Sequence, residues 1–395
     1  MGMEFRPYYL SREWVKMGHD VTIIGGDFSH LRKKNPDVSE DFTEETIDGI
    51  RYVWIKTGEY SSNGSARAKS MFRFCKKLSS NGRRIVDRYK PDVVISSSTY
   101  PLDSYPACKI AKIAGAKYIH EVHDMWPSTL YEAGGMARKH PFVVLMQIAE
   151  NHAYKHADVV VSLLKHAEPY MREHGLKEGK FRYVPNGIIA GEWEAEKELP
   201  KAHAEAFDRF EKEGKFVIGY FGSHELSYGL HNLLDVIKEM ENEDIALAMV
   251  GKGKMKDELI KYAEGNNIKN VVFLPPVEKT LIPSVVSRFD AIFIGTIASS
   301  LYRFGICMNK MFDSMMAAKP IVIAITTPST AVSESGCGIA TESCDNEAIK
   351  AAIRKIKNMT PEERSAMGQK GRDAVMKHYT YESIAKDFEG IMKSL

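Results

Sequence analysis

The first half of the chain alternates short apolar runs with longer segments of helical pattern. The runs are DVTIIGG at 20–26, IRYVWIK at 50–56, DVVISSS at 92–98, AKYIHEVHD at 116–124 and ADVVVSLL at 157–164. Short apolar runs that are bounded by turn residues and separated by helix-length segments indicate β-α-β units with a parallel sheet. The first half is therefore predicted to be a doubly wound α/β domain.

The second half repeats this rhythm. Its runs are KFVIGYFGS at 215–223, IALAMVGKG at 245–253, NVVFLPPV at 270–277, DAIFIGT at 290–296 and KPIVIAIT at 319–326. The stretch between the halves is polar and has no strand pattern, which is typical of a linker. We predict an N-terminal domain at 1–190, a linker at 191–214, a C-terminal domain at 215–378 and a helix at 379–395 that packs back on the N-terminal domain.

Composition narrows the choice of function. The chain has 395 residues, which favours two domains, and its formal net charge of +2 argues against nucleic acid as an obligatory partner. The five cysteines form no C-x-x-C pair, which fits a reduced, cytoplasmic protein. The longest apolar run, at 142–149, is too short to cross a bilayer. A membrane, if involved, is expected to be touched rather than crossed.

The stretch YRFGICMNKMFDSMMAAKP, Tyr302 to Pro320, carries the most specific chemistry. Two α/β domains across a hinge are expected to bind ligands at the carboxyl ends of their strands, and this stretch follows such a strand. Gly305 before a helix start would offer unpaired N–H groups and a positive dipole end to an anion. The stretch also carries an acid, Asp313, and is therefore the strongest candidate for a ligand site.

This block occurs together with HDMWP at 123–127, PNGI at 185–188, GYFGSHELSYGL at 219–230 and VSESGCGI at 332–339. Together they resemble family 4 retaining glycosyltransferases of the GT-B fold, and in particular the bacterial branch that includes O-antigen N-acetyl-L-fucosamine transferases. The resemblance covers nearly the whole chain. It implies two Rossmann-like domains facing a central cleft.

The resemblance also implies the substrates. The donor would be a nucleotide diphosphate sugar, with a UDP-sugar favoured, lying against the C-terminal domain. The acceptor would be a polyprenyl-linked saccharide in the synthesis of lipopolysaccharide or another surface polysaccharide. The sequence has no D-x-D motif of the kind that holds a metal against a sugar nucleotide, so no metal or other cofactor is predicted.

By position, the resemblance implies roles for several residues. Asp313 would bind the ribose, the backbone amides of Gly305, Ile306 and Cys307 the diphosphate, and His123 the donor sugar and phosphate. Further donor contacts are implied at Gly222, Ser223, Gly251 and Gly253, which follow two strands of the second half. The usual Arg and Lys after the first of these strands are replaced by residues such as Ser223, His224 and Tyr228, so we expect Arg303 and Lys310 to neutralise the diphosphate.

The start of the chain departs from the GT-B pattern, because MGMEFRPYYLSREWVKMGHDV is typical of a first helix. The strand that opens such a domain is therefore expected to be missing. Two other functions stay open at this point. One is a nucleotide-sugar 2-epimerase, which needs several carboxylates in the crevice. The other is a non-catalytic module that binds nucleotide sugars.

The stretch 66–90 is strongly basic. Its cations are Arg67, Lys69, Arg73, Lys76, Lys77, Arg83, Arg84, Arg88 and Lys90, and Asp87 is its only acid. A solvated helix face is one explanation. Docking on an anionic membrane, at the inner face of the cell membrane, is the other.

Overall fold

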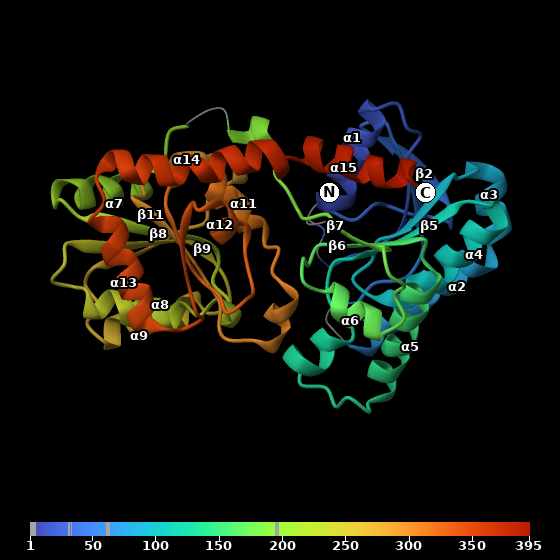
Figure 1. Cartoon of the computed structure of the whole chain (residues 1–395), viewed down its shortest axis with the longest axis horizontal. Helices are drawn as coiled ribbons and strands as arrows, with labels where there is room; N and C mark the ends of the chain where they lie inside the picture. Colours follow the sequence, from blue (N-terminus) through green and yellow to red (C-terminus); the bar gives the residue numbers. More distant parts are fainter. Residues whose placement is uncertain (1–4, 31, 33, 61–63, 194–196) are drawn as a thin grey trace. The chain divides into compact units, whose positions relative to one another are not determined.

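The computed structural model describes residues 5–30, 32, 34–60, 64–193 and 197–395 (Figure 1). They form two compact units. Unit 1 comprises Met1–Asn186 and Tyr381–Leu395, and unit 2 comprises Gly187–Thr380. Both are α/β structures built on mainly parallel sheets, as the apolar runs predict.

Unit 1 contains seven strands among the described residues. Its elements are α1 (Phe5–Lys16), β1 (Thr22–Gly26), β2 (Thr43–Ile47), β3 (Ile50–Ile55), α2 (Ser65–Ser80), α3 (Gly82–Tyr89), β4 (Val93–Ser96), η1 (Pro101–Asp103), α4 (Ser104–Ala114), β5 (Lys117–Val122), η2 (Thr129–Ala133), α5 (Pro141–His156), β6 (Val159–Ser162), α6 (Glu168–Glu173), β7 (Phe181–Tyr183) and α15 (Tyr381–Lys393). The strands form two sheets, β1-β3-β2 and β4-β5-β6-β7, in which only the β2–β3 pair is antiparallel.

The C-terminal helix α15 belongs to unit 1 because it packs on α1. The indole of Trp14 donates to the carbonyl of Ala385 at 3.1 Å and lies edge-on to Phe388. Tyr9 and Tyr381 bring their ring centroids within 4.8 Å.

Unit 2 is built on one six-stranded sheet. Its elements are η3 (Ala190–Trp193), α7 (Lys201–Lys212), β8 (Phe216–Ser223), η4 (Leu226–Tyr228), α8 (Leu230–Glu239), β9 (Ile245–Lys252), α9 (Lys256–Gly265), β10 (Val271–Leu274), η5 (Lys279–Leu281), α10 (Ile282–Ser287), β11 (Ala291–Gly295), η6 (Ser300–Phe304), α11 (Asn309–Met316), β12 (Ile321–Ala324), α12 (Ala331–Ser335), β13 (Gly338–Thr341), α13 (Asn346–Lys357) and α14 (Pro361–His378). The strand order is β10-β9-β8-β11-β12-β13, all parallel.

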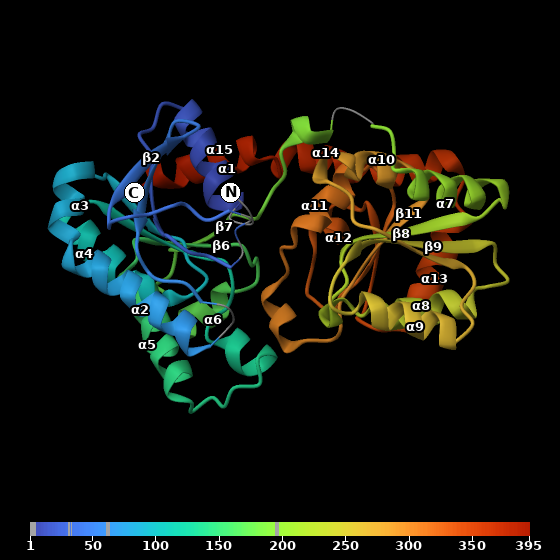
Figure 2. The ribbon, with the colours of Figure 1, turned by 180° about the vertical axis from the view of Figure 1, so that it is seen from behind.

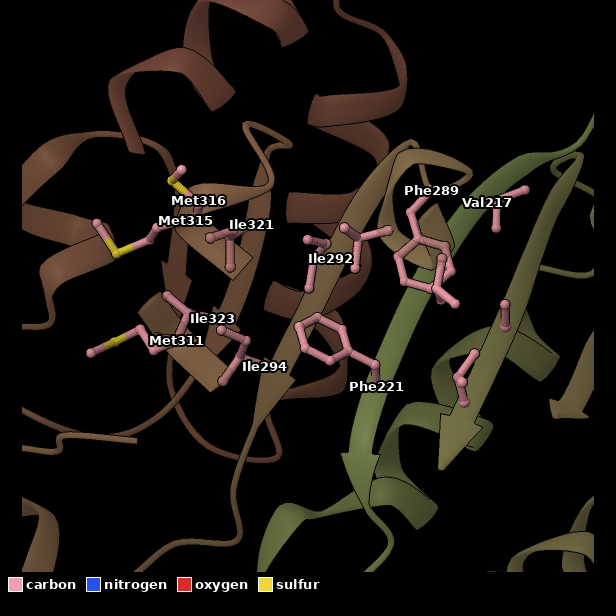
Figure 3. Close-up of a cluster of buried hydrophobic side chains, with 14 of the residues drawn as sticks. Val217, Phe221, Phe289, Ile292, Ile294, Met311, Met315, Met316, Ile321 and Ile323 are labelled. Atoms are coloured by element: carbon pink, nitrogen blue, oxygen red, sulfur yellow. The ribbon is translucent and has the colours of Figure 1, made fainter. Parts of the chain in front are cut away.

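Alternating side chains of β8 supply both faces of this sheet. Val217 and Phe221 join a core that includes α11, whereas Ile218 and Tyr220 join a core that includes α8, α9 and α13. Helices consequently cover both faces (Figure 2). Met311, Met315 and Met316 of α11 lie over β11 and β12, which fixes α11 against the sheet (Figure 3).

The division into units differs from the predicted linker at 191–214. Residues Lys201–Lys212 form α7, and the buried side chains of Phe207 and Phe210 pack in the core of unit 2. The segment looked like a linker because its charged residues occupy the outer face of an amphipathic helix. The chain passes between the units at residues 186–187 and 380–381 instead.

The two sheets of unit 1 share a core. Ile24 of β1 and Val94 of β4 pack against the same buried cluster, which contains Ile55, Ile85 and Ile110. Yet β1 and β4 each pair with one strand only among the described residues, and most of their residues are half-buried, whereas β6 is buried throughout. The described part of unit 1 opens with α1, as the sequence predicts, and includes no strand that pairs with both β1 and β4.

We expect that joining an apolar strand and a short glycine-containing loop ahead of Met1 will raise the melting temperature. Each fully buried Val, Ile or Leu would contribute about 1.5–3 kcal/mol before the entropy of ordering is subtracted. The matched control is a Gly/Ser extension of the same length. The prediction fails if the two extended chains melt at the same temperature in calorimetry.

Candidate active site

The strand order of unit 2 places a ligand site at one edge of its sheet. The chain builds outward from β8 in one direction through β9 and β10, and in the other through β11, β12 and β13. Open α/β sheets bind ligands at the carboxyl ends of the strands where the order reverses, here β8 and β11. Ser223 ends β8, and the segment Ser300–Phe304 follows β11. Both belong to the predicted site.

The last residues of β8 and β9 and the loops that follow these strands approach each other backbone to backbone. A Cβ atom on Gly251 would lie 1.9 Å from the carbonyl oxygen of Gly222, and one on Gly253 would lie 2.3 Å from the carbonyl oxygen of His224. Gly222 and Gly251 also have positive φ angles of 123° and 154°. Only glycine fits these constraints. The structure thus brings together three of the glycines predicted to contact the donor. Close backbone packing or a positive φ angle explains why each position needs glycine.

Lys310 lies in a pocket of tyrosines. Its Nζ is 3.1 Å from the hydroxyl of Tyr220 and 3.4 Å from the ring centroid of Tyr228. Burial lowers the pKa of this lysine to about 7. Among the described residues, no carboxylate forms an ion pair with it. A desolvated cation whose partners in the described part of the chain are aromatic faces and a hydroxyl is suited to receive an anion.

The start of α11 adds hydrogen-bond donors beside this lysine. Gly305 is buried with a φ of 98°, so the turn before the helix needs glycine. The N-cap residue, Met308, supplies no side-chain acceptor to the first helical turn. An eight-residue helix with an uncapped first turn presents backbone N–H groups and a positive dipole end. The predicted Gly305–Cys307 segment therefore lies where an anion would be stabilised.

The side chain of Arg303 contacts residues of its own turn, η6. Its guanidinium donates to the carbonyl of Ser300 at 2.5 Å and lies 4.1 Å from the ring centroid of Phe304. The side chain is exposed. Its predicted part in neutralising the diphosphate stays a prediction.

Asp313 lies less than one helical turn beyond Lys310, in a different environment. Burial raises the pKa of its carboxyl to about 6, although the charge of Lys279 and a hydrogen bond from Trp193 oppose the rise. Lys279 in turn pairs with Glu192 at 2.5 Å. Sequence reasoning missed Glu192, Trp193 and Lys279, because they come from η3 and η5 and only the fold brings them to α11.

His224 is a second residue whose surroundings the sequence did not reveal. Its side chain is fully buried, and neither ring nitrogen has a hydrogen-bond partner among the described residues. Burial and the nearby charges of Lys256 and Lys310 lower its pKa to about 4. His224 is therefore neutral at pH 7, with one donor and one acceptor unused.

In unit 1, His123 follows β5 and is fixed by its neighbours. Its Nε2 lies 3.0 Å from Oε2 of Glu121 and 2.9 Å from the hydroxyl of Ser97, which follows β4. Since an ionised carboxylate can only accept, Nε2 carries the proton and Nδ1 is left to contact other groups. The sequence singled out His123 but missed both partners.

Glu121 is itself held by a buried ion pair with Arg6 at 2.9 Å. Burial by itself would raise the pKa of Glu121, but Arg6, His123 and Ser97 hold it well below the usual range. Arg6 also donates to the carbonyls of Val184, at 3.0 Å, and Pro185. The ion pair thus ties α1 to β5 and to the segment after β7.

Two features of the described residues bear on other functions. They contain no group of three or more His, Cys, Asp or Glu side chains that could hold a metal ion, and His152 and His156 lie together without a third such residue. None of the helices in the described part of the chain is both long and apolar enough to span a bilayer.

Comparison with known proteins gives the family. Residues 1–187 match the Glycosyl transferase 4-like domain, and residues 201–374 match the Glycosyl transferases group 1 family. The chain is a glycosyltransferase of the GT-B fold. The two matches lie mainly in unit 1 and unit 2 respectively. The expected GT-B fold of two Rossmann-like domains is confirmed.

Individual relatives are distant. This glycosyltransferase is 26% identical over 337 residues to the probable glycosyltransferase WbjE of Pseudomonas aeruginosa, covering 82% of this chain and 79% of WbjE. Among solved structures it resembles a sucrose-phosphate synthase from Thermosynechococcus elongatus (TM-score 0.72, 16% identity, 98% and 91% of the two chains). It also resembles Anabaena HepE in complex with UDP and glucose (TM-score 0.62, 15% identity, 88% and 87%).

We expect Glu121→Gln to destabilise unit 1 strongly, because it leaves the buried guanidinium of Arg6 without a counter-charge. Removing one partner of a buried pair costs about 3–5 kcal/mol of the free energy of unfolding. Urea unfolding followed by tryptophan fluorescence would measure it. The control is Glu44→Gln, which breaks the exposed pair with Arg88 and should change stability far less. Equal effects of the two substitutions would contradict the assignment.

Proposed function

We propose that the protein transfers a hexosyl unit, in particular an N-acetylated deoxyhexosamine, from a UDP-sugar to a lipid-linked saccharide during the synthesis of O-antigen or another surface polysaccharide. The observation that carries the donor side of this proposal is Lys310, a half-buried cation without an acidic partner among the described residues, beside the uncapped start of α11. The UDP bound to Anabaena HepE, a protein of the same fold, supports the choice of nucleotide.

Lys310 and the amides of Gly305, Ile306 and Cys307 would bind the diphosphate. Negative charge on the departing diphosphate grows as the glycosidic bond breaks, so a fixed positive charge stabilises the transition state more than the ground state. The neutral imidazole of His224 lies close enough to the charge of Lys310 to respond to it, and it has unused hydrogen-bonding capacity.

Asp313 would bind the ribose hydroxyls through its carboxylate. The positive charge of Lys279 helps to keep the carboxylate ionised near pH 7, against the effect of burial. The indole of Trp193 and the Lys279–Glu192 pair fix the surroundings of the carboxylate. The family resemblance gives His123 a role on the donor sugar, and its fixed tautomer supports a hydrogen-bonding role.

Retention of configuration and independence of metal are further parts of the proposal. The cation and the helix dipole would supply the stabilisation that a metal gives in other sugar-nucleotide enzymes. The leaving group would then be stabilised electrostatically, without a covalent enzyme nucleophile.

Peripheral contact with an anionic membrane through 66–90 stays a proposal as well. Several of these cations have internal partners: Lys77 pairs with Asp41, Arg88 pairs with Glu44 and Arg84 lies over the ring of Phe42. Lys69, Lys76, Arg83 and Lys90 are exposed and have no acidic partner among the described residues. These four are the cations left for lipid headgroups at the inner face of the cell membrane.

Kinetics at saturating donor would separate the two donor residues. Asp313→Ala should remove hydrogen bonds made in both the ground and transition states, costing about 1.5–3 kcal/mol each and raising KM for the donor. Lys310→Ala should instead lower kcat, because its charge matters most as the bond breaks. Lys355→Ala, an exposed change on α13, is the control. The roles are wrong if Lys310→Ala changes only KM or if Asp313→Ala leaves KM untouched.

The lowered pKa of Lys310 predicts a pH dependence of UDP binding. The ammonium form is present below about pH 7 and is lost above it, so affinity should fall as pH rises, by at most about tenfold per pH unit. Calorimetric titration between about pH 7.5 and 9 avoids the ionisation of the UDP phosphate. Lys310→Arg keeps its charge over this range and should bind UDP with nearly constant affinity. The same decline in both proteins would contradict this prediction.

A further inference from the structure

Unit 1 contains a cavity of about 550 Å³ that the donor site does not use. It is lined by Asp27, Lys56, Gly58, Arg73, Lys76, Lys77, Ser80 and Asn81. Asp27 directly follows β1 and Lys56 directly follows β3, so the cavity lies at the carboxyl ends of parallel strands. This is the edge where such sheets bind ligands, and the volume is that of a small-molecule site.

Four of the lining residues are cations, and α2 aligns three of them. Arg73, Lys76, Lys77 and Ser80 follow the i, i+3, i+4, i+7 spacing of one helix face. Arg73 donates to the carbonyl of Thr57, and Lys77 donates to the carbonyl of Lys56 and to Asp41, both at 2.8 Å. These bonds hold the cations in place before any ligand arrives.

The acids near the cavity are already engaged. Asp27 accepts hydrogen bonds from the amide of Thr57 at 2.7 Å and from its hydroxyl at 2.9 Å, while Asp41 pairs with Lys77. Lys76 is exposed and makes no hydrogen bond or ion pair with any residue that the structure describes. Four cations against two acids leave an excess of positive charge, which suits a doubly ionised phosphoryl group.

We propose that this cavity binds the phosphoryl group of the acceptor, which makes the acceptor a phosphate or diphosphate ester. The inference rests on the proposed transfer to a lipid-linked saccharide and identifies the part of the acceptor that unit 1 holds. Lys76 closes on the phosphoryl oxygens, while Arg73 and Lys77 provide the fixed positive wall.

Calorimetric titration with inorganic diphosphate, in the presence of saturating UDP, tests the site apart from unit 2. Lys76→Gln should weaken diphosphate binding about tenfold or more, the loss expected for one charge-assisted contact. Lys76→Arg should restore it. Lys112→Gln, the same change at an exposed position on α4 away from the cavity, should alter it less than about twofold.

The affinity for UDP, measured on the same proteins, separates this inference from the proposed function. If UDP fails to bind while diphosphate binding still depends on Lys76, the donor proposal fails and the cavity assignment stands. Equal diphosphate affinity in Lys76→Gln and Lys112→Gln overturns the cavity assignment.

Vesicles of phosphatidylcholine with phosphatidylglycerol distinguish a lipid headgroup from the acceptor. If the protein floats with these vesicles in a Lys76-dependent way but does not bind inorganic diphosphate, the cavity assignment is also overturned, in favour of a membrane surface.

Discussion

The buried ion pair between Arg6 and Glu121 is the interaction on which unit 1 depends at its strand ends. A guanidinium and a carboxylate that leave water are stable only while every donor and acceptor is paired. Arg6 comes from α1, Glu121 from β5, and the remaining acceptors of Arg6 come from the segment after β7. These elements must therefore assemble together. The same carboxylate orients His123, so the stability of unit 1 and the geometry of its candidate site rest on one interaction.

Much of the fold could be predicted because burial on both faces leaves a strong apolar signal. Every predicted apolar run contains a strand of the structure. The missed strands lack that signal. The strand β2 is TEETI, with three exposed residues, and it pairs antiparallel at a sheet edge. The strand β7 has three residues and includes the exposed Arg182. The strand β2 is specified by its antiparallel partner β3 and by the turn that joins them, and β7 is specified by its parallel pairing with β6. Apolar periodicity reports neither of these constraints.

The candidate site was predictable where its residues are close in the sequence. Gly305, Lys310 and Asp313 belong to one turn and one helix, and the structure keeps them there. Their surroundings were not predictable, because they come from distant segments. Tyr220 and Tyr228 enclose Lys310 from β8 and η4. Arg6 was missed for a related reason: on a single helix it looks like a surface residue, and only the packing of α1 on the sheet buries it.

The edge strands of the two sheets in unit 1 differ in charge, and this difference affects whether a second chain can pair with them. The outer strands carry charge, with Glu44 and Glu45 on β2 and Arg182 on β7. By contrast, β1 (TIIGG) and β4 (VVIS) contain no charged residue, and each lies at the other edge of its sheet. Charged side chains on an edge strand discourage pairing with another chain, whereas an uncharged apolar edge invites it. If the molecule opens partly, self-association should therefore begin when a strand of a second chain pairs with β1 or β4. The helical surfaces should take no part in this contact.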